Sequence, residues 1–127
     1  MSLPLAVAPN KILIVPLSSN PQLNPITHRL SARLRKLGIA NFIDASSASI
    51  GKRYARNDEL GTPLGITIDF DTLKDGSVTL RERDSMVQVR GLEEEVVTAV
   101  KGLVDGTETW DQVVRRMVVF GGQEETT

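Results

Sequence analysis

The sequence predicts an α/β domain with a three-layer α/β/α arrangement and a mixed, mostly parallel five-stranded sheet. Apolar, β-branched runs alternate with stretches of helical period along most of the chain. The 127 residues suffice for one core and leave no room for a second domain of ordinary size. The hydrophobic share of 40% is that of a globular domain rather than a disordered segment.

The chain opens with a strand and a helix. Residues 11–17 form a short apolar run, typical of a strand buried on both faces, and Pro16 ends it because proline has no amide donor. The next helix has Asn24 as its predicted N-cap, Pro25 at its first position and Gly38 as its left-handed end. Its core-facing stripe consists of Ile26, Leu30, Leu34 and Leu37. Its water-facing stripe consists of Arg29, Arg33 and Lys36.

The middle of the chain predicts a second strand at residues 39–44 and a second helix at residues 50–60. Residues 64–70 alternate between apolar and polar, which predicts a strand with one buried face. The dipeptide Asp75-Gly76 is a strong turn signal, and residues 77–83 alternate again. We therefore expect an antiparallel hairpin closed by this turn.

The last third predicts a strand at residues 85–90 and an amphipathic helix at residues 92–103. Thr109 and Gln112 have the spacing of a capping box and predict a short final helix. We expect the domain to occupy residues 1–120 and to end in a frayed polar tail, residues 121–127.

Charge is unevenly distributed along the chain. Residues 1–90 carry 12 Lys and Arg against 8 Asp and Glu, whereas residues 91–127 carry 3 against 8. A polyanionic partner should therefore meet the first two-thirds of the chain, although uneven solvated faces give the same pattern.

Several kinds of chemistry are excluded. The chain has no cysteine and one histidine, His28, so thiol catalysis, disulfides and Cys/His metal sites are absent. The sequence contains no run of about 18 apolar residues, which a membrane span would need. Its N-terminus lacks the pattern of a signal peptide. Asp69 and Asp71 are a conceivable magnesium pair, but a solvated strand end is the interpretation that we favour.

Two groups of basic residues suggest contacts to a phosphate backbone. They are Lys52, Arg53 and Arg56 at a helix start, and Arg81 and Arg83 on one face of a strand. Candidate stacking surfaces for bases are Tyr54, Phe70 and Met86. Core packing is the competing interpretation of Tyr54 and Phe70.

Two long motifs carry a family resemblance: SIGKRYARNDELGTPLGITIDFDT at residues 49–72 and TLRERDSMVQVR at residues 79–90. They resemble the C-terminal anticodon-binding domain of eukaryotic glycyl-tRNA synthetases, which are class II enzymes. LPLAVAPNKILIVPL at residues 3–17 and TWDQV at residues 109–113 are similar to segments of the same family. The resemblance covers nearly the whole chain and implies the α/β/α fold.

The resemblance implies a tRNA-binding module of an ATP-dependent ligase that joins glycine to tRNA. The parent enzyme's ATP, Mg²⁺ and glycine sites belong to a catalytic domain that this chain lacks, so we assign no catalytic, cofactor or metal residue here. Met1 then marks a domain boundary. The implied partner is the anticodon loop of glycine tRNA, with no membrane contact. The implied parent is a homodimer through its catalytic domain, cytoplasmic and also mitochondrial, and the isolated domain is monomeric.

Base reading suggests further residues. Every glycine anticodon ends in two cytosines, and the exocyclic amino group of cytosine is best accepted by a carboxylate. We favour Asp84 as this carboxylate, with Glu82 and Asp71 as alternatives and with Arg81 and Arg83 holding adjacent phosphates. The competing interpretation is that Asp84 caps a turn.

Two other functions remain open at this point. One is an accessory or protein-interaction domain of the same fold, as in a polymerase processivity subunit. The other is a small doubly wound enzyme or ligand-binding protein with a site at the strand ends. A class II catalytic core elsewhere in the full-length reading frame would favour the tRNA-binding module over both.

Overall fold

The computed structural model describes residues 12–17, 21–45, 52, 63–83 and 85–120. Its elements are β1 (Ile12–Pro16), the 3₁₀ turn η2 (Pro21–Leu23), α1 (Asn24–Lys36), β2 (Asn41–Ile43), β3 (Leu64–Ile68), α3 (Phe70–Asp75), β4 (Ser77–Glu82), β5 (Gln88–Leu92), α4 (Glu93–Asp105), α5 (Trp110–Arg116) and β6 (Val118–Phe120). None of the helices in these ranges is long and apolar enough to cross a membrane.

The strands form one mixed sheet in the order β2-β1-β3-β4-β5-β6. β1 runs parallel to both β2 and β3, whereas the pairs β3–β4, β4–β5 and β5–β6 are antiparallel. The predicted α/β class with a mixed sheet is confirmed. The sheet has six strands rather than five, because the chain turns back after α5 and adds the three-residue strand β6.

The antiparallel pairing of β3 with β4 is confirmed, with Ile66 opposite Leu80. The predicted tight turn between them is wrong, because the six-residue helix α3 intervenes. Asp69 caps that helix through a capping box with Thr72, and Gly76 ends it with a φ of 76°. The Asp-Gly signal therefore marks a helix end rather than a hairpin turn, since glycine suits the left-handed conformation at both. The predicted one-sided burial of β3 is also wrong, since all five of its residues are buried.

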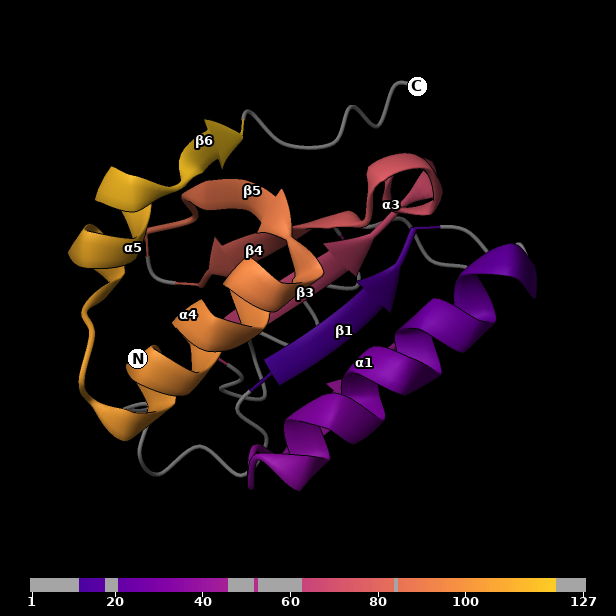
Figure 1. The fold of residues 1–127 in the computed structure, drawn as a ribbon, viewed down its shortest axis with the longest axis horizontal. Helices are drawn as coiled ribbons and strands as arrows, with labels where there is room; N and C mark the ends of the chain where they lie inside the picture. Colours follow the sequence, from indigo (N-terminus) through magenta and orange to yellow (C-terminus); the bar gives the residue numbers. More distant parts are fainter. Residues whose placement is uncertain (1–11, 18–20, 46–51, 53–62, 84, 121–127) are drawn as a thin grey trace.

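One face of the sheet, here called the helix face, is covered by α1 and α4, which lie side by side in front of it (Figure 1). Its core is formed by buried aliphatic side chains from strands and helices, among them Ile14, Ile66, Leu80, Leu30 and Val100. Residues of α5 extend the same core. The helix predicted over residues 50–60 lies outside the described residues apart from Lys52.

The start of α1 differs from the prediction. Asn24 is already helical, because η2 leads directly into the helix, and the N-cap is Leu23 with no side-chain hydrogen bond. The buried face combines Leu30 and Leu34 with Thr27, whose hydroxyl donates to the carbonyl of Leu23. Hydrogen bonding lets this polar group lie in the core. Gly38 has the predicted left-handed conformation, with a φ of 80°.

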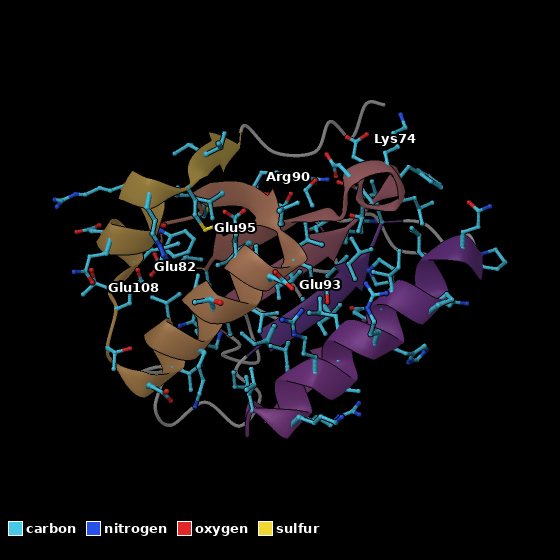
Figure 2. All side chains as sticks on the ribbon, in the orientation of Figure 1. Lys74, Glu82, Arg90, Glu93, Glu95 and Glu108 are labelled. Carbon is cyan, nitrogen blue, oxygen red and sulfur yellow. The ribbon has the colours of Figure 1, made fainter. Side chains whose placement is uncertain are left out.

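An ion-pair bridge connects the two helices of the helix face. Arg29 donates to Glu93 at 2.8 Å and Arg33 donates to the same carboxylate at 3.3 Å. Both arginines are partly exposed, as predicted, and they also join α1 to the first residue of α4. Glu93 lies beside the gap between α1 and α4 in Figure 2.

Candidate RNA-binding surface

The opposite face of the sheet, here called the second face, changes from apolar to polar across the strands. On β1 it presents Leu13 and Val15, which form a separate small apolar cluster. Strand alternation places Thr79 and Arg81 of β4 on this face, next to Arg90 of β5, which lies opposite Thr79 in the register. A buried polar row therefore crosses the antiparallel half of the sheet.

Arg90 is the centre of this row. Its two terminal nitrogens donate to the two carboxylate oxygens of Asp69, at 2.7 and 2.9 Å, in a bidentate pair. Further donations reach the hydroxyl of Thr79 at 2.9 Å and the hydroxyl of Ser77 at 2.9 Å. The hydrogen bond to Asp69, together with the charge of that carboxylate, raises the pKa of Arg90 above its usual value. The charge of Arg90 is therefore balanced inside the protein, and its role is to tie β5 and β4 to the start of α3.

Sequence reasoning did not identify this pair. Asp69 is not the solvated strand end that we favoured: it is buried, it caps α3, and it binds Arg90. The capping-box spacing from Asp69 to Thr72 was a local signal for the helix. Arg90 is 21 residues away from Asp69, and no local pattern connects them.

Ser77 links the second face to Asp75 at the end of α3. Its hydroxyl donates to the Asp75 carboxylate at 2.6 Å, and its backbone N–H donates to the same oxygen at 2.9 Å. These hydrogen bonds, the side-chain bond first, lower the pKa of Asp75 below its ordinary value of 3.8. A lowered carboxyl pKa stabilises the fold above the unfolded-state pKa, and the contribution disappears as the pH falls through the folded-state value.

We therefore predict that Ser77→Ala raises the pKa of Asp75 toward 3.8 without reversing the sign of its shift, because the backbone donor remains. The measurement is an NMR titration of the side-chain carboxyl carbon in both proteins. Asp71, which is exposed and lies on the same short helix, is the reference carboxyl. An Asp75 titration curve that Ser77→Ala does not move would contradict the assignment of the hydroxyl as the main cause.

The predicted RNA-binding residues lie at different places. Arg81 lies on β4 and Arg83 is in the turn that follows it, and each is only 8% exposed. Glu82 lies between them, and strand alternation puts it on the face opposite to Arg81. Asp71 belongs to α3, beyond the opposite end of β4, a strand about 17 Å long. Figure 2 shows Lys74 of α3 and Glu82 at opposite ends of the sheet.

The remaining predicted residues are only partly described. Lys52 is exposed. Arg53, Arg56 and Asp84 lie outside the described residues, as does Tyr54. The structure therefore places Arg81 and Arg83 near one end of β4 and Asp71 beyond the other end, and base reading by Asp84 stays a prediction. Among the residues with described positions, no three His, Asp or Glu side chains lie close enough to hold a metal ion.

Comparison with known protein families decides what this fold is. The family described as "Anticodon binding domain" matches residues 11–103. This range includes β1 to β5 and most of α4, and it leaves out α5 and β6. The chain belongs to the anticodon-binding domain family. The sequence resemblance is thereby confirmed at the level of the domain.

The curated relatives are more specific. The chain is 50% identical over 125 residues to "Putative glycine--tRNA ligase" of Schizosaccharomyces pombe, covering 98% of this chain and 19% of the relative. It is 50% identical to "Glycine--tRNA ligase 1, mitochondrial" of Saccharomyces cerevisiae, covering 98% of this chain and 18% of the relative. It is 49% identical to "Glycine--tRNA ligase" of Drosophila melanogaster, covering 97% and 16%. The chain thus spans less than a fifth of the length of these relatives.

Solved structures support the fold. The prolyl-tRNA synthetase of Cryptosporidium parvum matches with a TM-score of 0.75 at 22% identity, covering 91% of this chain and 24% of that one. The RNA-binding domain of threonyl-tRNA synthetase from Cryptosporidium parvum Iowa II matches with a TM-score of 0.71 at 20% identity, covering 80% and 25%. At these identities the likeness establishes the fold alone.

Proposed function

We propose that this domain binds the anticodon loop of glycine tRNA on behalf of a longer glycine–tRNA ligase. The observation that carries the proposal is about 50% identity to glycine–tRNA ligases over nearly the whole chain, within a segment that matches the anticodon-binding family. The relatives favour this function over an accessory polymerase subunit. In this proposal, glycine activation with its ATP and Mg²⁺ belongs to a part of the parent protein outside this chain. The parent protein forms a homodimer through that part.

The physical support comes from the antiparallel half of the sheet. The turn that joins β4 to β5 exposes Ser85 and Met86, whereas Arg81 and Arg83 beside it are each only 8% exposed. An exposed turn suits a single-stranded loop, whose bases are splayed and contacted on their edges and faces. A mitochondrial form of the parent agrees with the Saccharomyces cerevisiae relative that is named mitochondrial, and we propose a cytoplasmic form beside it.

We expect the isolated domain to bind a stem-loop RNA carrying a glycine anticodon more tightly than the same RNA with uridines in place of the two cytosines. Three to five phosphate contacts predict a log–log salt slope of about −2 to −3.5, since each single-strand phosphate contributes about −0.7. Fluorescence anisotropy across a salt series measures both quantities. Equal affinity for the two RNAs would contradict anticodon recognition.

A charge-reversal pair tests where the RNA lies. Lys52→Glu should weaken binding of both RNAs alike and flatten the salt slope by about 0.7, because one phosphate contact is lost. Lys36→Glu is the matched control, since Lys36 is an exposed cation on α1, which covers the helix face. Equal losses in the two variants would indicate general attraction rather than a defined surface.

A further inference from the structure

The turn that joins β4 to β5 contains a backbone conformation that is unusual for its residue. Met86 has a φ of 60°, and within the described ranges it is the only residue other than glycine with a positive φ. In this left-handed region the Cβ of an L-residue crowds a backbone oxygen, so that glycine or asparagine is the common occupant. The backbone conformation at this position therefore costs less energy with glycine or asparagine than with methionine.

Backbone hydrogen bonds fix this conformation. The N–H of Met86 donates to the carbonyl of Glu82 at 2.9 Å, and the N–H of Glu82 donates to the carbonyl of Val87 at 3.2 Å. The turn is also attached to the residue that precedes β3, because the N–H of Arg83 donates to the carbonyl of Pro63 at 2.9 Å. Strained residues persist where their surroundings determine the conformation in this way, and they concentrate at binding sites.

The side chain of Met86 does not offset this strain by packing. It is 67% exposed, and among the exposed large apolar side chains that the structure describes only Val118 is more open, at 70%. A glycine or asparagine here would fit the turn and would expose less apolar surface to water. Folding stability therefore does not account for a methionine at this position.

We propose that Met86 is a contact for the aromatic face of an unstacked base in the bound RNA, an inference that rests on the proposed function. The thioether is polarisable and unbranched, and it makes favourable contacts with aromatic rings. Arg83 belongs to the same turn and Arg81 lies on the strand that leads into it, but each is only 8% exposed, so the contact that we propose depends on Met86 itself. Because every base has an aromatic face, this contact adds affinity without selecting a base.

Two substitutions separate contact from backbone strain. Met86→Gly removes the side chain and relieves the strain, so we expect binding of the glycine anticodon stem-loop to weaken about 2- to 10-fold while the thermal midpoint does not fall. Met86→Leu keeps an apolar side chain of similar size, so its affinity should stay within about 2-fold of wild type. Leu92→Ala is the control, because Leu92 is an exposed apolar residue at the other end of β5.

Single abasic substitutions along the RNA loop then locate the base. One loop position should lose affinity when made abasic with the wild-type protein and lose much less with Met86→Gly, since the two changes remove the same contact. Wild-type affinity for the intact loop in Met86→Gly, or equal losses in Leu92→Ala, would overturn the inference. A wild-type protein that does not discriminate the anticodon would instead overturn the proposed function, and the Met86 contact with it.

Discussion

Replacing Arg90 by methionine is expected to lower the free energy of unfolding by about 3–5 kcal/mol, a large part of the stability of a domain this size. The substitution leaves the carboxylate of Asp69, which is 4% exposed, without its bidentate partner. A buried charge that has lost its partner is costly because water cannot reach it. The hydroxyls of Ser77 and Thr79 lose their donor as well. Urea unfolding at neutral pH measures the difference.

The control for this prediction is an exposed ion pair of the same type. Lys101 and Asp105 lie 3.0 Å apart on α4 and are each 42% exposed, so Lys101→Met should cost less than about 1 kcal/mol. Adding Asp69→Asn to Arg90→Met should recover part of the loss, because no buried charge then remains. Similar small losses in Arg90→Met and Lys101→Met would show that the buried pair does not hold the second face together.

Short-range signals predicted much of the fold. The strand that ends at Pro16, the left-handed end of α1 at Gly38 and the capping box of Thr109 with Gln112 are all confirmed. Each depends on the backbone chemistry of a few neighbouring residues: a missing amide donor, a missing Cβ, and a hydroxyl within reach of an N–H. Such features are visible in sequence because their causes are local.

The errors have physical causes too. Asp75-Gly76 suits both a hairpin turn and a helix end, and only the capping box at Asp69 distinguishes the two. β6 has three residues, too few to show a periodicity, and it forms because β5 offers an edge for pairing. Asn24 lost its predicted role as N-cap because a 3₁₀ turn precedes it, which depends on how the chain leaves β1.

The site was predictable only as far as alternation reaches. A period of two puts Leu80 and Arg81 on opposite faces of β4, but it does not show what covers either side chain. Two features depend on contacts between residues far apart in the sequence, which no local pattern predicts. They are the burial of Arg81 and Arg83 and the pairing of Arg90 with Asp69. Sequence alone likewise could not show that α3, which carries Asp71 and Lys74, and Glu82 lie at opposite ends of the sheet, as Figure 2 shows for Lys74 and Glu82.

The other large effect is expected from Leu80→Ala, which should lower the free energy of unfolding by about 2–5 kcal/mol. Leu80 is 0% exposed, lies between Ile66 and Val89 in the sheet register, and belongs to the core of the helix face. Truncation removes apolar contacts and leaves a cavity that a closely packed core fills only in part. Leu73→Ala is the control, since Leu73 is 40% exposed on α3, and it should cost less than about 1 kcal/mol.

The same variant separates stability from RNA binding. Leu80 and Arg81 are neighbours on β4 and point to opposite faces of the sheet. Well below its unfolding transition, Leu80→Ala should therefore bind the glycine anticodon stem-loop within about 2-fold of wild type, because the second face is unchanged while the core behind it is weakened. Affinity that falls in the fully folded variant as far as it does in Met86→Gly would mean that the RNA depends on the helix face, and the proposed surface would be wrong.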